Sequence, residues 1–121
     1  METFSHAELA YLQSERRLAR LATADADGQP HVTPVGMWSY NAALNTIDVS
    51  GRNFAATRKY RNVRTNPKAA LVVDDLASVD PWRPRAVLVE GPAEAVAPDD
   101  GNAALIRIAL ARIISWGLDT Q

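Results

Sequence analysis

The sequence contains no cysteine, which excludes disulfide bridges, thiolate catalysis and cysteine-based metal sites. It has only two histidines, His6 and His31, and neither has an acidic residue or a second histidine at a metal-ligand spacing. We therefore expect no metal site. No G-x-G-x-x-G pattern follows a strand, which argues against a dinucleotide-binding fold, and no serine lies in a G-x-S-x-G setting, which argues against a serine hydrolase.

Long hydrophobic runs are missing as well. The longest, 69–73 and 86–89, are far too short to cross a bilayer, and the first residues lack the basic-then-apolar pattern of a signal peptide. We therefore expect a cytoplasmic protein without a membrane span. With 121 residues, 47% hydrophobic and 22% charged, the composition is typical of one globular domain over 1–121.

Turn-forming residues divide the chain into short segments. A capping box formed by Ser5 and Glu8 predicts a helix that ends near Ser14. Apolar, β-capable segments follow, and the expected strands are 17–24, 30–40, 46–50, 68–74, 85–97 and one or two within 104–116. The pair Gly91-Pro92 predicts a bulge or bend within its strand. About six short strands and two small helices favour a mainly β, antiparallel barrel.

The most distinctive segment runs from Arg52 to Arg64 and carries five cations and no acid in a chain of net charge −1. It follows a strand and Gly51, and a helix is expected over 54–65, whose N-terminal N–H groups favour an anion. This order predicts a phosphate cradle for a nucleotide-like or flavin-like ligand. Arg52, Arg58 and Lys59 lie nearest the helix start, whereas Arg61 and Arg64 are more typical of a solvated helix face.

Other uses of the same residues stay open from the sequence. Nucleic acid is a weaker interpretation of the cations, because the patch is short and the domain as a whole is not basic. His31 faces either a ligand or solvent. Of the three tryptophans, Trp82 on a proline-bearing loop is a candidate for contact with a planar ligand, while Trp38 and Trp116 are expected in the core or an interface.

Several of these segments together resemble a known superfamily. The succession His31-Val-Thr-Pro-Val35, strand 46–50, Thr57-Arg58-Lys59 and 66–73 is similar to the flavin-binding split barrels, whose best-known member is pyridoxamine 5′-phosphate oxidase. In that family a Ser-Arg-Lys triplet grips the flavin phosphate, and Thr57-Arg58-Lys59 stands in its place. The segment 31–35 stands where a strand runs along the isoalloxazine ring. Segments 74–84, 90–94 and 112–118 look most like short actinobacterial proteins thought to use the deazaflavin F420.

The resemblance implies a six-stranded antiparallel split β-barrel with two short helices that forms a homodimer with the cofactor between subunits. It implies an F420H2-dependent reductase that passes a hydride to an unsaturated or quinone-like small molecule, with no dedicated acid–base residue. The sequence ends before the longer C-terminal region with which pyridoxamine phosphate oxidases hold substrate, which argues against that specific activity. The implied cofactor-binding residues are His31, Val32, Thr33, Pro34, Val35, Ser50, Arg52, Thr57, Arg58, Lys59 and Trp82. Alternatives are an FMN-binding oxidoreductase of the same fold, a non-catalytic cofactor-binding protein and a small nucleic-acid-binding barrel.

Overall fold

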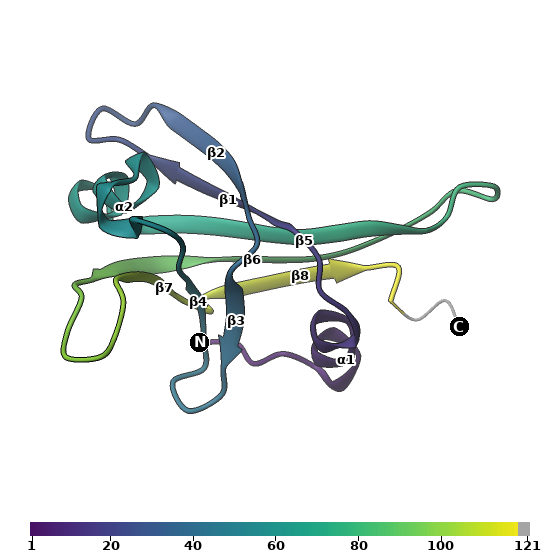
Figure 1. The fold of residues 1–121 in the computed structure, drawn as a ribbon. Coiled ribbons are helices and arrows are strands. Elements are labelled where there is room, and N and C mark those ends of the chain that lie inside the picture. The colour runs from purple at the N-terminus through teal and green to yellow at the C-terminus, as the bar shows by residue number, and fades with distance from the viewer. Residues whose placement is uncertain (119–121) are drawn as a thin grey trace.

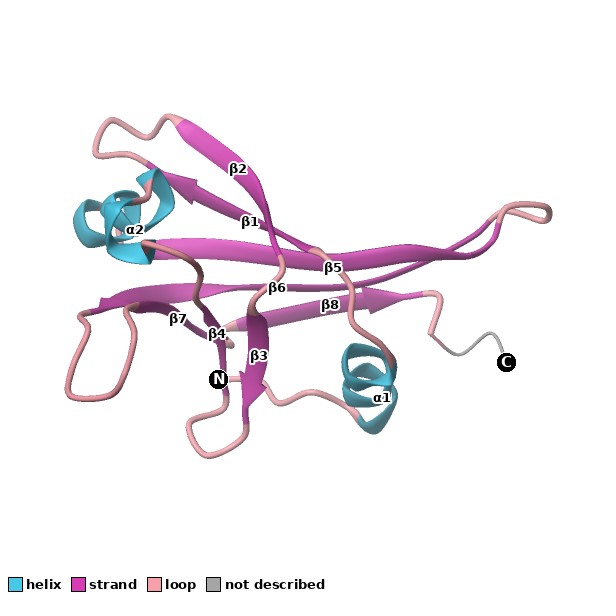
Figure 2. Cartoon of the chain, viewed as in Figure 1, coloured by secondary structure: helices cyan, strands magenta, loops and turns pink. Residues whose placement is uncertain are grey.

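Eight strands and two α-helices make up residues 1–118, the part of the chain that the computed structural model describes (Figures 1 and 2). In chain order the elements are α1 (His6–Ser14), β1 (Ala19–Ala24), β2 (Pro30–Val35), β3 (Trp38–Asn41), β4 (Thr46–Val49), the 3₁₀ turn η1 (Phe54–Ala56), α2 (Arg58–Thr65), β5 (Lys68–Ser78), β6 (Arg83–Val96), β7 (Leu105–Ala109) and β8 (Arg112–Trp116).

All strand pairs are antiparallel and follow the order β2-β1-β5-β6-β7-β4-β3, with β8 added to β6. This confirms the mainly β, antiparallel class. Over residues 1–118, β2 and β3 at the two ends of this path do not pair, so the sheet is not closed. A closed barrel follows only if such end strands meet. The fold is therefore an open, split arrangement of one continuous sheet.

The expected number of six strands was too low. The segment 30–40 divides at Gly36 and Met37, because β2 pairs with β1 whereas β3 pairs with β4. Residues 104–116 form two strands, one of the two outcomes the sequence left open. Strand β5 also continues four residues beyond Asp74, to Ser78. Asp75, the first residue beyond the expected end, lies directly opposite Arg85 on β6, so its charge is neutralised across the ladder and the strand continues.

The core lies on one face of this sheet. Its fully buried side chains alternate along the strands; among them are Leu21, Leu71, Val73, Val89, Ile106 and Ile108. Helix α2 adds Tyr60 and Val63 to this core, and the Tyr60 ring packs edge-to-face on Phe54 at 5.9 Å between centroids. Burial of this apolar face positions α2 across β1 and β6, which matters for the site described below.

Gly91, where the sequence predicts a bulge or bend, lies where β6 changes its neighbour. Residues Ala86–Glu90 pair with β8, and Ala93–Val96 pair with β7. The connection between β7 and β8 passes directly over Gly91, and its Ala111 N–H donates to the carbonyl of Glu90 at 3.1 Å. A Cβ at Gly91 would overlap the carbonyl oxygen of Ala109. Glycine is required here because another backbone approaches too closely for a side chain.

A partly buried ionic cluster fixes α1 to the sheet. The carboxylate of Asp75 accepts hydrogen bonds from Arg85 Nη2 at 2.7 Å, Arg17 Nε at 2.9 Å and the Tyr11 hydroxyl at 3.0 Å. The hydrogen bonds from Arg85, with those from Arg17 and Tyr11, lower the pKa of Asp75 to about 2 although burial opposes the shift. Desolvation and the bond to Asp75 raise the pKa of Tyr11 to about 12.

We expect this cluster to make the fold acid-sensitive. Because the folded-state pKa of Asp75 lies below the ordinary 3.8, its stabilising contribution is complete above about pH 4 and is lost as the pH falls toward 2. Asp75→Asn should lower the free energy of unfolding by about 2 kcal/mol at pH 7. Urea unfolding at pH 7, 4 and 3 should show that the free energy of unfolding falls less with decreasing pH in Asp75→Asn than in wild type. Asp27→Asn, in an exposed turn, is the control, and equal declines in all three proteins would refute the assignment.

Candidate functional site

The start of α2 is built by a short sequence of turns after β4. The chain passes Gly51, takes a left-handed conformation at Asn53 (φ 48°) and forms the 3₁₀ turn η1. Thr57 is then extended (ψ 155°), its hydroxyl donates to the Phe54 carbonyl at 2.6 Å, and it accepts from the Tyr60 N–H. The single helix expected over 54–65 is therefore wrong: a helix N-cap needs non-helical backbone, so α2 begins only at Arg58.

Two cations, Arg58 and Lys59, open α2 without acidic partners, and Arg52 precedes them in the turn after β4. Within residues 1–118, Arg52, Arg58 and Lys59 form no ion pair. Arg58 is exposed, and Lys59 Nζ lies 5.4 Å from the centroid of the Phe54 ring. Arg61 differs, because its guanidinium donates to the Ala56 carbonyl and so braces the 3₁₀ turn. The first N–H groups of α2 point the same way as its dipole, so the helix start is suited to an anion.

His31 joins this cluster from another part of the sheet. It lies on β2 opposite Thr23 of β1, whose buried hydroxyl accepts a hydrogen bond from Asn62 of α2 at 3.1 Å. The Nδ1 atom of His31 is buried and has no hydrogen-bond partner. Burial, followed by the charges of Arg58 and Lys59, lowers the pKa of His31. The sequence left open whether His31 faces ligand or solvent, and the structure places it beside the two cations.

The other residues of β2 alternate between two faces. Thr33 and the buried Val35 share the face of His31, whereas Val32, 66% exposed, and Pro34 point to the opposite face. Within the described chain β2 pairs only with β1, so one edge of its backbone remains available. Pro34 carries no N–H to offer there. A ligand that crosses this edge would therefore meet backbone groups from His31 to Thr33 rather than a row of side chains.

Two predicted site residues lie elsewhere in the chain. The Ser50 N–H donates to the Met37 carbonyl at 2.8 Å, and Ser50 lines a separate cavity of about 370 Å³ with Met37 and Asp48. Trp82 lies in the turn between β5 and β6, at the end of these strands opposite to α2 (Figure 1). The 11 residues of β5, at about 3.3 Å each, place it about 35 Å from the helix. Within one chain Trp82 does not lie beside the cations.

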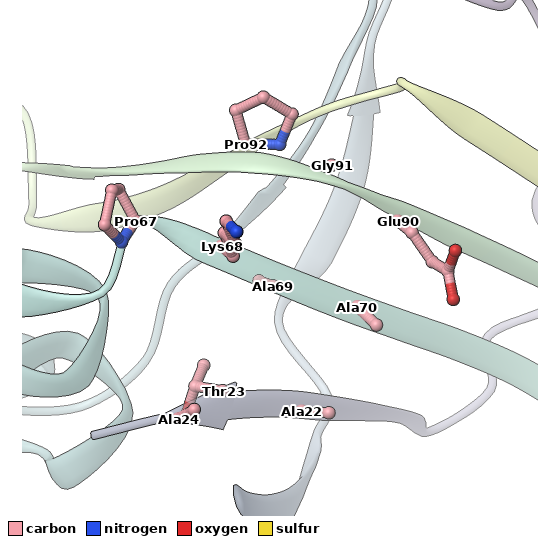
Figure 3. Close-up of a pocket in the computed structure, with 10 residues that line it drawn as sticks. All are labelled: Ala22, Thr23, Ala24, Pro67, Lys68, Ala69, Ala70, Glu90, Gly91 and Pro92. Carbon is pink, nitrogen blue, oxygen red and sulfur yellow. The ribbon is translucent and has the colours of Figure 1, made fainter. Parts of the chain in front are cut away.

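Sequence reasoning missed an apolar groove of about 520 Å³ that crosses β1, β5 and β6 (Figure 3). Its lining consists of Ala22–Ala24, Pro67–Ala70 and Glu90–Pro92. The groove is open because small side chains from neighbouring strands, such as Ala22 and Ala70, stand side by side on one face of the sheet. Alternating alanines in two strands were the available signal, but strand pairing had to be known before they could be combined.

The described residues were also compared with the requirements of a metal site and of a membrane-spanning helix. No group of three or more histidine, aspartate or glutamate side chains within 1–118 is placed to hold a metal ion. None of the helices described is long and apolar enough to cross a membrane.

With this geometry established, comparison with known proteins gives the family. The family model for pyridoxamine 5′-phosphate oxidase matches residues 5–121. The chain belongs to the pyridoxamine 5′-phosphate oxidase family. Membership agrees with the open antiparallel sheet and confirms the resemblance seen in the sequence.

Relatives in this family include a named reductase. The 5a,11a-dehydrotetracycline/5a,11a-dehydrooxytetracycline reductase of Streptomyces rimosus is 37% identical over 123 residues, covering 96% of this chain and 84% of that protein. A conserved hypothetical protein from Mycobacterium tuberculosis has a TM-score of 0.73 at 23% identity, with 97% and 87% of the two chains covered. A structure described as an F420 reductase has a TM-score of 0.66 at 19% identity, with 87% and 94% covered. The chain is an oxidoreductase of this family.

Proposed function

We propose that this protein is an F420H2-dependent reductase that transfers a hydride to an unsaturated or quinone-like small molecule. The observation that carries the proposal is the meeting of His31, with its unpartnered buried Nδ1, and the unpaired Arg58 and Lys59 at the start of α2. In the flavin-binding split barrels that the sequence resembles, this helix start holds the cofactor phosphate. The 37% identical relative, whose name describes the reduction of a dehydro compound, supports the reaction class.

The residues present fit an anionic cofactor. Arg58 and Lys59 would bind its phosphate through charge-assisted hydrogen bonds, which are stronger than neutral ones. The first N–H groups of α2 would add to this field, and the hydroxyl of Thr57 holds the helix start in place through its bonds to Phe54 and Tyr60. The free edge of β2 would align the ring. Once bound, the deazaflavin supplies a hydride from a ring carbon, and the protein's task is to place that carbon and to exclude water.

The residues at the site suit binding better than acid–base catalysis. Within residues 1–118, His31 is the titratable group whose pKa is lowered by the charges of Arg58 and Lys59, after burial, and this lowered pKa keeps it neutral near pH 7. We therefore assign binding and orientation to this chain's residues rather than acid–base catalysis. An unsaturated, largely apolar molecule suits such a site, because its reduction depends on how closely its acceptor carbon is held to the donor.

A homodimer is part of the proposal. One face of the sheet carries Val72, Leu88 and Ile114 in directly opposed positions, with the exposed Val32 on the same face of β2 and Trp116, 49% exposed, at its margin. Both helices contact the other face, through the Asn62–Thr23 and Tyr11–Asp75 hydrogen bonds. An apolar sheet face of this breadth is typical of a protein interface, and a second copy would cover it.

The cofactor is tested by anaerobic titration of the purified protein with F420H2 and with FMN. We expect F420H2 to bind more tightly than FMN, and addition of a quinone or an enone to oxidise it, so that the visible absorbance of the oxidised deazaflavin F420 increases. Much tighter binding of FMN would replace the deazaflavin assignment with an FMN-dependent one. Binding of F420H2 without oxidation by any acceptor in a panel would indicate a non-catalytic carrier.

We expect cofactor binding to take up protons at His31. In the free protein burial and the charges of Arg58 and Lys59 on α2 lower the pKa of His31, and the residue opposite it on β1 is the uncharged Thr23. A bound phosphate would offset the two cations and raise this pKa, so affinity should increase as the pH falls from 8 to 6.

Calorimetric titration of the protein with the cofactor, in two buffers of different ionisation enthalpy, measures the number of protons taken up on binding. The phosphate monoester of FMN titrates near pH 6 and acts in the opposite direction, so the informative quantity is the difference between wild type and His31→Gln. Wild type should take up more protons than the variant. The same uptake in both proteins would show that His31 does not respond to the ligand.

A further inference from the structure

Two buried polar side chains, Thr23 of β1 and Asn62 of α2, are hydrogen-bonded to each other beneath His31. Their exposed fractions are 4% and 6%, and Asn62 Nδ2 donates to Thr23 Oγ1 at 3.1 Å. Burying a polar group costs free energy unless its hydrogen bonds are made, so an apolar pair would be the simpler contact between α2 and β1. The polar pair at this position therefore indicates a role beyond packing.

The hydroxyl of Thr23 keeps one unused donor. A hydroxyl oxygen can accept hydrogen bonds and its proton can be donated, and here the oxygen accepts from Asn62. Within residues 1–118 the hydroxyl proton is donated to no other group. Because an N–H of Asn62 points at the oxygen, the hydroxyl proton is directed away from α2.

An unused acceptor lies directly across the ladder. Thr23 and His31 are opposed in register, and opposed side chains share one face of the sheet. In the part of the chain that the structure describes, Nδ1 of His31 is the one buried side-chain nitrogen or oxygen without a hydrogen-bond partner. Opposed residues have Cβ atoms only about 4.5–5.5 Å apart, so a small tilt of the imidazole brings Nδ1 to the hydroxyl.

We infer that Asn62 and Thr23 are positioning residues that hold His31 by a relay of two hydrogen bonds, from Asn62 to Thr23 and from Thr23 to Nδ1. The inference rests on the function proposed above, in which His31 lies beside the cofactor phosphate. With Nδ1 as the acceptor, the neutral imidazole carries its proton on Nε2. That N–H is then available to donate to the ligand.

The relay also suits the protonated imidazole. When His31 takes up a proton, Nδ1 becomes a donor, and the oxygen of Thr23 can accept from it. The ring therefore keeps one orientation in both states, with its Nε2–H group directed at the ligand. A valine at position 23 has a similar shape and would fill the same space, but it would not orient the ring.

Nitrogen-15 NMR of the free protein tests the relay without a cofactor, because it distinguishes a protonated ring nitrogen from an unprotonated one. The chain has two histidines, and His31→Ala assigns their signals. At about pH 9 the imidazole is neutral. Wild type should then carry at least about 90% of the His31 proton on Nε2.

Three variants change the relay in different ways. Asn62→Asp reverses it, because a carboxylate accepts from Thr23 and cannot donate, so the proton of His31 should move to Nδ1. Thr23→Val removes the relay and should leave both neutral forms populated. Thr23→Ser keeps the hydroxyl and is the matched control, with the tautomer ratio of wild type. Thermal unfolding checks that each variant is folded, and if Asn62→Asp does not fold, the two variants of Thr23 decide the outcome.

Affinity for F420 shows whether the relay acts through His31. Thr23→Val should weaken binding about fivefold because one positioning hydrogen bond is lost, and Thr23→Ser should stay within about twofold of wild type. In a His31→Ala background, Thr23→Val should change the affinity by less than about 1.5-fold, because the residue that it positions is absent. A merely structural role would give the same loss in both backgrounds.

Two results would overturn the relay. One is a tautomer ratio that is the same in wild type and in every variant, and the other is an equal loss of affinity from Thr23→Val with and without His31. A wild type that binds neither F420 nor FMN would instead overturn the proposed function. The spectra of the free protein would still decide the relay in that case.

Discussion

Replacing both Arg58 and Lys59 with alanine should weaken binding of the cofactor at least tenfold, which corresponds to about 1.4 kcal/mol. Both residues lie at the start of α2 without ion-pair partners within residues 1–118, so their removal leaves no internal acid unpaired. The loss should therefore appear as affinity rather than as stability. Fluorescence titration with F420 measures the affinity, and thermal unfolding of the free variant measures the stability.

A matched control removes the same charge from the same helix. Arg61→Ala combined with Arg64→Ala takes two cations from the later turns of α2, where Arg61 braces the Ala56 carbonyl and Arg64 lies in the last turn. At ordinary ionic strength, salt screens charges that lie more than about 10 Å apart, which weakens the effect of these two cations on a phosphate at the helix start. The loss of affinity in this variant should therefore be less than threefold. Equal losses in both double variants would mean that net charge, and not the helix start, attracts the ligand.

The largest loss of stability should come from Gly91→Ala, which we expect to lower the free energy of unfolding by at least about 3 kcal/mol. The new methyl group would overlap the Ala109 carbonyl oxygen and lie 3.1 Å from the Ala111 nitrogen. Both are backbone atoms of the connection between β7 and β8, so relief requires that connection to move. Its displacement would weaken the Ala111 hydrogen bond to Glu90 and separate β7 and β8 from β6.

Gly36→Ala is the control for Gly91→Ala. A methyl group there would meet only the Leu18 side chain, at 3.8 Å, and the change should alter stability by less than about 1 kcal/mol. Urea unfolding of the two variants beside wild type makes the comparison. A Gly91→Ala protein as stable as Gly36→Ala would show that the β7–β8 connection does not close over β6 as described.

Local sequence signals predicted much of the fold. The capping box at Ser5 and Glu8 forms as expected, with the Glu8 carboxylate 2.7 Å from the Ser5 nitrogen. Glycine at 91 indicated a special point in its strand before the neighbouring backbone was known. The errors came where distant segments decide the outcome. The strand predicted to end at 74 continues because Arg85 lies opposite Asp75. The single strand predicted over 30–40 divides because its two halves pair with different partners.

The candidate site was predictable in its parts but not in its assembly. Charge and position in the sequence singled out Arg58 and Lys59, and the family resemblance added the strand of His31. Their meeting depends on α2 lying over β1, which is fixed by buried contacts such as Asn62 with Thr23. The groove could not be predicted, because Ala22, Ala70 and Gly91 become neighbours only through strand pairing. Trp82 was expected near a ligand, and its remote place in one chain follows from the length of β5.

A crystal structure of the protein grown with F420 tests the central claim most directly. We expect the phosphate within hydrogen-bond distance of Arg58 and Lys59, the imidazole of His31 turned toward it and the ring along the free edge of β2. A phosphate bound elsewhere, with Arg58 and Lys59 left in solvent, would contradict the account.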